Sequence, residues 1–370
     1  MPGIRGLTTV ERGVGGVAVG LLLAGIVGAG TFSPAHDSTS LPAVTTSVRT
    51  ADPSPAAIPV PAPTTTVAKK RTVVDRPIAP APPLSGCPVP HRSGGGGKPK
   101  PLPPPVVAEA ALPAPVPVHG KAGDLTAVRG KGLWATPFGK APLDVDGLIS
   151  QARRAQVRSI WVRTGRTRQG YYGQQFLPRL ITQAHAAGLF VIAWDFPFLS
   201  DPVADARRAE QALVAGVDGF SPDVETTAEG TRLTSRRLRL YLSLVRQAAG
   251  TRPVIATVPR PSSARRGYPY SAFPPYADVF APMVYWSCRE PGAVVQQSLA
   301  VLTKLLPVAP VGQGYDMGDE GGRRGTPSRQ ETLRFLDAAR RAGAIGASLW
   351  TVEEAGPAQL RALADYRWSR

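Results

Sequence analysis

Cysteine, methionine and histidine are scarce in this chain, whose 370 residues include two Cys, three Met and four His. Cys87 and Cys288 lie far apart and no C-x-x-C spacing occurs, which excludes a structural zinc site of the cysteine-rich kind. Only His185 falls within the part that we expect to fold, in a helical stretch where a surface position is the ordinary explanation. We therefore expect no metal site, no histidine-based nucleophilic triad and no cofactor.

Acidic residues are also in the minority. The chain has 26 Asp and Glu against 43 Lys and Arg, and its formal net charge at pH 7 is +17. A nucleic-acid-binding protein would gather its basic residues with aromatic ones on one element, whereas these arginines are spread over several helix-like segments. We expect no nucleic-acid partner. The charge suits attraction to an anionic cell wall or membrane surface; a solvated helix face is the alternative, and the oligomeric state stays open.

Charged residues are missing from residues 13–32, an apolar run rich in Gly, Val, Leu and Ala. Its length is about what a membrane-spanning helix needs, and Arg5 and Arg12 before it favour an orientation with the N-terminus inside. Residues 1–32 therefore predict a signal peptide or a signal anchor. Small residues near 28–30 and 33–35 form no clean A-x-A cleavage site, so the choice stays open. Either way, we expect an extracellular or cell-surface protein.

Residues 33–120 are rich in Pro, Ala, Thr and Val, with proline runs near 80–83 and 103–105. Proline fixes φ and removes a hydrogen-bond donor, so neither helix nor sheet propagates. Such a composition buries too little apolar surface to offset the entropy of ordering. We expect a disordered, semi-extended linker. A disulfide between Cys87 and Cys288 would tether it to the folded domain in an oxidising compartment, and this pairing stays open.

The pattern changes in residues 121–370, where short apolar runs alternate with amphipathic stretches. The apolar runs predict strands at 132–135, 159–162, 190–194, 219–224, 254–257, 279–283, 310–312 and 347–349. The amphipathic stretches predict helices at 145–155, 176–187, 203–215, 235–248, 294–305, 330–342 and 357–366. Strands alternating with helices form parallel βαβ units. The length suits an α/β fold of the (β/α)8 TIM-barrel class, which takes about 250 residues.

A doubly wound α/β sheet is the alternative architecture. It would usually carry a Gly-rich phosphate turn after its first strand, but residues 134–138 read WATPF. Gly also follows Ala at four predicted helix ends, where a left-handed cap is wanted: 187–188, 215–216, 249–250 and 342–343. The stretch between the fifth and sixth predicted strands is rich in Pro and Tyr and holds at most a short helix. We therefore predict the barrel.

A barrel places its active site at the carboxyl ends of its strands. Those ends carry several aromatic side chains among acids, as expected where flat sugar faces stack and hydroxyl groups need acceptors. A single tryptophan such as Trp134 would more often fill the core. Taken together, the predicted substrate-binding residues are Trp134, Arg163, Asp195, Tyr285, Trp286, Gln313, Tyr315, Asp316 and Trp350.

The sharpest feature is the pair of acids at the end of the fourth predicted strand. Because side chains alternate along a strand, Asp223 and Glu225 point to one side and Val224 points away into the helix layer. Two carboxyl groups held that close cannot both ionise freely, so one pKa rises. A carboxylic acid with a raised pKa can protonate a glycosidic oxygen. The alternative is that the acids cap the helix that begins near Thr234.

Residues 217–225 read VDGFSPDVE and resemble the fourth-strand signature of glycoside hydrolase family 18, the chitinase-type barrels, whose pattern is D-G-x-D-x-D-x-E. Asp218, Gly219, Asp223 and Glu225 match it, while Ser221 replaces an inner aspartate. Residues 281–285 resemble the family's sixth-strand Met-x-Tyr element, and 346–350 resemble its eighth strand, which ends in a tryptophan.

The resemblance implies that Glu225 is the general acid and that Asp223 orients the substrate's own acetamido group, the internal nucleophile of the family. It further implies that Tyr285 hydrogen-bonds the acetamido oxygen and that Trp350 stacks under the sugar ring. Ser221 departs from the pattern. A serine hydroxyl can hydrogen-bond Asp223 but cannot share its charge, so the departure weakens or removes the expected activity.

Family 25 muramidases also resemble this chain, since they carry Asp-x-Glu at the end of the fourth strand. They also need an aspartate near the end of the first strand, which residues 134–138 lack. We therefore expect a glycoside hydrolase-like protein whose partner is a polysaccharide or peptidoglycan and whose catalytic residues are Glu225 and Asp223. A non-catalytic glycan-binding barrel at the cell surface is the alternative. A metal-dependent deacetylase is disfavoured by the shortage of histidine.

Overall fold

The computed structural model describes residues 80–84, 105–118, 120–137, 143–262 and 267–368. The predicted signal peptide or anchor, residues 1–32, lies outside the described residues, as do residues 33–79 and 85–104 of the predicted linker. Within the described part of the chain, no helix combines the length and apolar character needed to cross a membrane.

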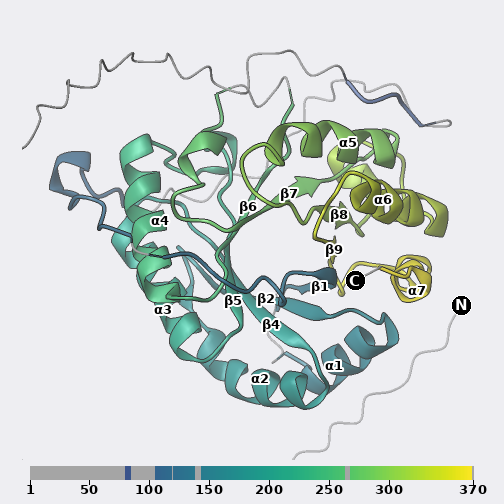
Figure 1. The fold of residues 1–370 in the computed structure, drawn as a ribbon, viewed down its shortest axis with the longest axis horizontal. Coiled ribbons are helices and arrows are strands. Elements are labelled where there is room, and N and C mark those ends of the chain that lie inside the picture. Colours follow the sequence, from purple (N-terminus) through teal and green to yellow (C-terminus); the bar gives the residue numbers. More distant parts are fainter. Residues whose placement is uncertain (1–79, 85–104, 119, 138–142, 263–266, 369–370) are drawn as a thin grey trace, which may run out of the picture. The chain divides into compact units, whose positions relative to one another are not determined.

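Parallel strands form a closed ring at the centre of the fold (Figure 1). In the order in which they are hydrogen-bonded, they are β5 Gly219–Pro222, β4 Phe190–Phe196, β2 Ser159–Arg166, β1 Gly130–Ala135, β9 Gly346–Trp350, β8 Val311–Gln313, β7 Val279–Val284 and β6 Ile255–Pro259. Parallel bridges from Phe220 to Val254 and from Asp223 to Thr257 join β5 to β6 and close the ring. The predicted (β/α)8 TIM barrel is confirmed.

Helices surround the strands on the outside of the ring (Figure 1). They are α1 Val145–Arg154, α2 Leu177–Ala186, α3 Pro202–Val214, α4 Ser235–Ala249, α5 Pro291–Leu302, α6 Arg329–Arg341 and α7 Pro357–Asp365. Side chains cap several of their N-termini, and Ser328 forms a full capping box with Glu331. Glycine at each of the four predicted Ala-Gly helix ends has a positive φ, as the left-handed cap requires.

Two small elements fall outside the regular alternation. The short strand β3, Gly170–Tyr171, pairs antiparallel with the end of β2. Between β6 and β7 the described residues contain only a short 3-10 helix, Tyr270–Ala272, as the Pro- and Tyr-rich sequence predicts.

Apolar side chains form two separate cores. The larger one lies between the strands and the helices and includes Val224. The smaller one fills the inside of the barrel, where Trp134, Trp161 and Trp194 pack with β-branched and small residues of the opposite strands. Burial on both faces explains why the strands read as nearly continuous apolar runs. It also means that the barrel is a packed core and not a pore.

Two pieces of the segment predicted as a linker have a defined position. In residues 105–118, Val107 N–H donates to Ser200 O at 3.0 Å and Val116 N–H donates to Ser243 Oγ of α4 at 3.1 Å. In residues 80–84, Leu84 N–H donates to Cys288 O at 2.8 Å. Cys288 is disulfide-bonded, and Cys87, the other cysteine of the sequence, lies outside the described residues.

Composition could not predict this ordering, because the partners come from the barrel. The guanidinium of Arg236 donates to Leu112 O at 2.6 Å, and that of Arg237 donates to Val107 O. A proline-rich chain keeps its carbonyl oxygens even where it lacks donors. The arginines of α4 use those acceptors to hold an extended segment that forms no regular structure of its own.

Candidate functional site

A cavity of about 400 Å³ opens at the carboxyl ends of the strands. Every barrel strand, or the loop that follows it, contributes to its wall. The lining residues are Trp134, Arg163, Arg166, Trp194, Phe196, Asp223, Glu225, Thr257, Met283, Tyr285, Val311, Tyr315, Trp350 and Glu354. This is the end of a (β/α)8 barrel at which catalytic groups gather, because the loops there can vary without disturbing the barrel core.

Asp223 and Glu225 both line the cavity, and Val224 between them is fully buried in the outer core. Two backbone hydrogen bonds hold this segment between its neighbours. Asp223 N–H donates to Asp195 O of β4 at 2.9 Å, and Val224 N–H donates to Thr257 O of β6 at 3.0 Å. The alternation predicted from the sequence is therefore present, and both carboxyl groups face the same space.

Asp223 is only 5% exposed, and burial raises the pKa of its carboxyl group to about 7. The Arg163 guanidinium opposes this rise, whereas the Asp195 and Glu229 carboxylates add to it. Its Oδ1 atom is buried and has no hydrogen-bond partner among the described residues. Desolvation without a compensating hydrogen bond penalises the charged form of an acid. Asp223 can therefore hold a proton close to neutral pH.

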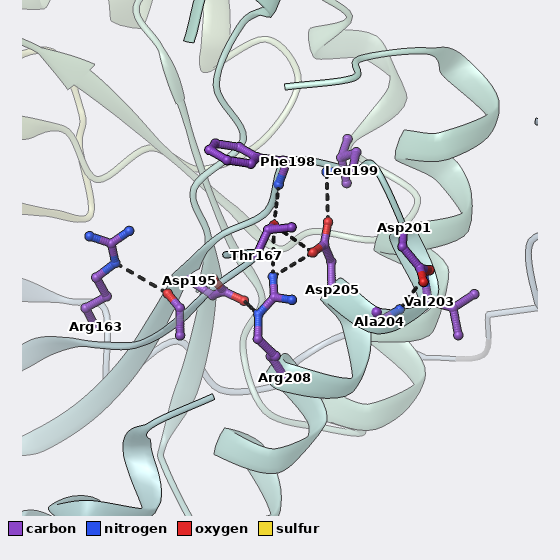
Figure 2. Close-up of polar contacts among 11 residues, drawn as sticks. Arg163, Thr167, Asp195, Phe198, Leu199, Asp201, Val203, Ala204, Asp205 and Arg208 are labelled. Carbon is purple, nitrogen blue, oxygen red and sulfur yellow. Dashed lines mark hydrogen bonds and ion pairs between the residues drawn. The ribbon is translucent and has the colours of Figure 1, made fainter. Parts of the chain in front are cut away.

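Asp195, which the sequence predicts as a substrate-binding residue, lies outside the cavity lining in a buried ionic network (Figure 2). Its Oδ2 accepts from Arg208 Nε at 2.8 Å, and Arg208 Nη2 lies 2.7 Å from Asp205 Oδ1. Burial raises the pKa of Asp195 to about 6, against the effect of Arg208. The prediction missed Arg208 because this cation comes from α3, packed against the far side of the strand.

Asp205 extends the same network toward the loop that follows β4 (Figure 2). Its two carboxylate oxygens accept from Leu199 N–H and from Thr167 Oγ1, each at 2.8 Å. Thr167 Oγ1 in turn accepts from Phe198 N–H at 2.8 Å. The network thus joins the loops after β2 and β4, next to the strand ends that carry Arg166 and Phe196 of the cavity wall.

Tryptophan side chains form the floor of the cavity. Trp134 is fully buried at the centre, with ring centroids 4.8 Å from Trp161, 5.4 Å from Trp194 and 5.5 Å from Trp350. The indole N–H of Trp134 donates to Ser348 Oγ at 2.8 Å. Trp350 is half-buried, so it exposes more of its ring than Trp134. Trp134 therefore supports the floor as core, while Trp350 offers surface on which a flat ligand can stack.

Two arginines of β2 lie on the cavity wall. Arg163 stands over the Trp194 ring, 4.9 Å from its centroid, and Arg166 lies 5.9 Å from the Phe196 centroid. Arg163 is predicted as a site residue, but Arg166 is not. The register of β2 against β4 shifts between Arg163 and Gly165, so residues three apart reach one side of the strand. The pairing of the two strands produces this bulge, so the alternation of apolar and polar residues along the sequence does not predict it.

Three further predicted residues lie outside the cavity lining. Trp286 is fully buried against Phe335, with centroids 5.5 Å apart, because it follows Tyr285 and points to the opposite side. Gln313 is buried and accepts from Ser287 N–H at 2.8 Å. Asp316 caps a 3-10 helix by accepting from Gly318 N–H at 2.8 Å.

The structure adds lining residues that the sequence prediction did not include. They are Arg166, Trp194, Phe196, Thr257, Met283, Val311 and Glu354. Thr257, Met283 and Val311 lie within strands, and only the alternation of those strands could have indicated that they face inward. Tyr285 and Tyr315 are predicted and do line the cavity, where their rings meet edge-on with centroids 5.4 Å apart.

Two positions of the acidic signature serve the barrel itself. Ser221 is fully buried, and its hydroxyl donates to Ile255 O at 2.7 Å. Asp218 lies at the other end of β5, where Oδ2 accepts from Val191 N–H at 2.7 Å and lies 2.9 Å from His185 Nε2. The half of the signature that faces the cavity is therefore Asp223 and Glu225. Among the described residues, no group of three or more His, Cys, Asp or Glu side chains forms a metal site.

Comparisons with known proteins agree with this architecture. No family profile and no curated protein matches the chain. Among solved structures, a chitinase from Bacteroides thetaiotaomicron is 10% identical with a TM-score of 0.50, over 64% of this chain and 95% of that one. The spore cortex-lytic enzyme SleL of Bacillus megaterium QM B1551 is 9% identical with a TM-score of 0.49, over 64% and 73%.

A chitinase from Chromobacterium violaceum ATCC 12472 is also similar, at 11% identity and a TM-score of 0.48, over 64% of this chain and 98% of that one. At such identities the likeness is one of fold. The domain shares the (β/α)8 barrel fold of the Bacteroides thetaiotaomicron chitinase, and a shared fold does not by itself determine the chemistry of a site.

Proposed function

We propose that this protein is an exported glycoside hydrolase that cleaves an N-acetylated polysaccharide or peptidoglycan. One observation carries the proposal: Asp223, Glu225, Tyr285 and Trp350, which come from three different strand ends, line a single cavity. These are the residues to which the resemblance to glycoside hydrolase family 18 assigns acid, acetamido-orienting, hydrogen-bonding and stacking roles. The similarity in fold to a chitinase supports the same reaction class.

The proposed chemistry uses Glu225 as the general acid. Its proton passes to the glycosidic oxygen while the C1–O bond breaks and the leaving sugar departs as an alcohol. The acetamido oxygen of the sugar that keeps C1 bonds to C1 in place of the leaving group and forms a five-membered oxazolinium ring. Water then attacks C1, opens this ring and returns a proton to Glu225. Asp223 faces the acetamido N–H and stabilises the positive charge that develops there. Water and the substrate supply all atoms, so no cofactor takes part.

Replacing the acid tests the proposal. Glu225→Gln keeps the size and polarity of the side chain but removes its proton, so kcat on chito-oligosaccharides or peptidoglycan should fall by about two to four orders of magnitude. Glu210→Gln, on the exposed face of α3, is the matched control and should keep parental turnover. Equal release of reducing ends by the parent and Glu225→Gln would remove Glu225 from the mechanism.

A non-catalytic glycan-binding barrel is the second candidate function. The observation that favours it is Ser221, whose hydroxyl is engaged with β6 and supplies no second acid beside Asp223. In that case, the parent protein would bind chito-oligosaccharides with the same Kd as Glu225→Gln and release no reducing ends. Calorimetry and a reducing-end assay on the same two proteins separate the two functions.

Export is proposed on compartment grounds. The apolar residues 13–32 after Arg5 and Arg12 support a signal peptide or anchor, and the disulfide-bonded Cys288 suits an oxidising compartment. The net charge of +17 suits an anionic wall or membrane surface. Fractionation of cells that express the full chain tests this location: protein found in the cytosolic fraction would contradict it, and release from the wall fraction by salt would support the charge argument.

A further inference from the structure

Arg163 and Arg166 occupy the β2 side of the cavity, and the chemistry assigned to Glu225 and Asp223 does not use them. Arg163 is only 4% exposed, and Arg166 is half-buried. Burial of an arginine is costly because the guanidinium group stays charged at any physiological pH. Arg163 is compensated in part, because its Nε donates to Gly165 O at 3.3 Å and its guanidinium group interacts with the Asp223 carboxyl group. The position of Arg166 on this wall needs a reason beyond packing.

Aromatic rings hold both guanidinium groups. Arg163 lies over Trp194, and Arg166 lies beside the Phe196–Phe198 pair, at 5.9 and 5.8 Å from their centroids. Contact with ring faces fixes the plane of a guanidinium group, so that the directions of its N–H donors are set in advance. Fixed planar donors suit an anion with two oxygens, which they can bind in a bidentate manner.

Arg166 has a buried donor atom that forms no hydrogen bond with the described residues. That atom is Nε, which is buried and lacks a hydrogen-bond partner in the described part of the chain. The acids of the cavity wall lie on other elements: Asp223 and Glu225 follow β5, and Glu354 follows β9. A charged donor left unsatisfied at the edge of a cavity is the place where a ligand acceptor would bind.

The strand order sets the distance between this wall and the acids. β4 lies between β2 and β5, so the backbones of β2 and β5 are two strand spacings apart, roughly 10 Å. The side chains converge on the cavity, and the Arg163 guanidinium group lowers the pKa of Asp223. When a substrate sugar binds beside the Glu225 carboxyl group, a substituent of that sugar or of the next one can therefore reach the two arginines.

We propose that Arg163 and Arg166 form a carboxylate subsite, so that the substrate is an acidic glycan in which a sugar at or beside the cleaved bond carries a carboxyl-bearing substituent. This proposal rests on the proposed function for the position of the cleaved bond. The carboxylate satisfies the Arg166 Nε donor and fills the β2 side of the cavity, while Glu225 acts on the glycosidic oxygen. Arg163 and Arg166 thereby determine specificity and take no part in proton transfer.

A matched pair of substrates tests the subsite: an N-acetylated oligosaccharide with a free carboxylate, and the same compound with the carboxylate reduced to an alcohol. The parent should prefer the acidic compound by about tenfold to a hundredfold in kcat/KM. Arg166→Gln should reduce this ratio to near one. Arg166→Lys keeps the charge but loses the fork of donors, and it should keep only part of the preference.

Arg168→Gln is the matched control, since Arg168 is exposed, lies two residues beyond Arg166 in the turn between β2 and β3, and is absent from the cavity lining. It should keep the parental ratio. Thermal melts of all three variants identify any that fail to fold. If Arg166→Gln fails to fold, Arg166→Lys still tests the subsite. Equal kcat/KM of the parent for both compounds would overturn the subsite and leave the hydrolase intact.

Binding to Glu225→Gln separates the subsite from the proposed function. If the parent cleaves neither compound but Glu225→Gln still binds the acidic one at least tenfold more tightly, the hydrolase proposal fails and the subsite stands. If Glu225→Gln binds both compounds equally, the subsite fails whatever the activity of the parent.

Discussion

The hydroxyl of Ser221 lies 2.7 Å from the hydroxyl of Thr257. Because Ser221 donates its own proton to Ile255 O, the Thr257 hydroxyl is the donor in this pair. Both contacts cross from β5 to β6, where the strands are joined by isolated bridges. The residue that departs from the acidic signature thus closes the barrel. The sequence predicted that Ser221 could hydrogen-bond Asp223, but its hydroxyl points toward β6, where it contacts Ile255 and Thr257.

Ser221→Ala should lower the free energy of unfolding by about 1–3 kcal/mol, since Ile255 O and the Thr257 hydroxyl would lose their partner in a buried place. Ser221→Asp should cost more, because it buries a further carboxyl group beside Asp223. Urea unfolding measures both, with Ser150→Ala on the exposed face of α1 as the control. A Ser221→Asp variant as stable as the parent would show that the barrel accommodates the family's acid at this position.

Asp223 should make stability depend on pH. Its pKa is about 7 in the folded protein against an ordinary value of 3.8. Between these values, the folded state holds a proton that the unfolded chain lacks, so the free energy of unfolding falls as pH rises toward 7. Asp223→Asn removes this loss of free energy of unfolding. Relative to the parent, the variant should therefore be more stable at pH 8 than it is at pH 4.

Urea midpoints at the two pH values measure that difference. Asp195, whose pKa is about 6, titrates in the same window, so Asp223→Asn should retain part of the slope. Asp337→Asn, on the surface of α6, should keep the parental slope. Identical slopes for the parent and Asp223→Asn would mean that Asp223 is ionised at neutral pH.

Arg208→Ala should lower the free energy of unfolding by about 3–5 kcal/mol, because it leaves Asp195 and Asp205 buried without their cation. Arg207→Ala, the exposed neighbour on α3, should change it by less than about 0.5 kcal/mol. Chemical denaturation of the two variants side by side measures the contrast. Similar small losses in both would indicate that water enters and solvates the acids.

Lys131 should produce the opposite pH dependence on the alkaline side. Burial lowers its pKa from 10.5 to about 8, and its Nζ donates to Leu363 O of α7. Between pH 8 and 10.5, the unfolded chain holds a proton that the folded state lacks, so the free energy of unfolding rises with pH. Lys131→Met should lose this rise, while the exposed Lys304→Met should keep it. Urea midpoints at pH 8 and 10 provide the comparison, and a rise preserved in Lys131→Met would assign it to other groups.

The barrel and the position of its acids were predictable because their signals are local. Apolar spacing of period two or 3.6, side-chain caps and Ala-Gly helix ends each depend on a few neighbouring residues. They located every barrel strand and the surrounding helices, and they put Asp223 and Glu225 on one side of a strand end with Val224 on the other.

Which strand-end residues open to the cavity was decided only by the tertiary structure. The shift in register beside Thr164 brought Arg166 to the wall next to Arg163. Packing against Phe335 withdrew Trp286 from the wall, and an arginine from α3 drew Asp195 into a buried network. The partners that decide these positions lie 13 or more residues away in the chain, so no local pattern records them. Spacing along the sequence sets the direction of a side chain, while its neighbours in space decide whether it meets a ligand.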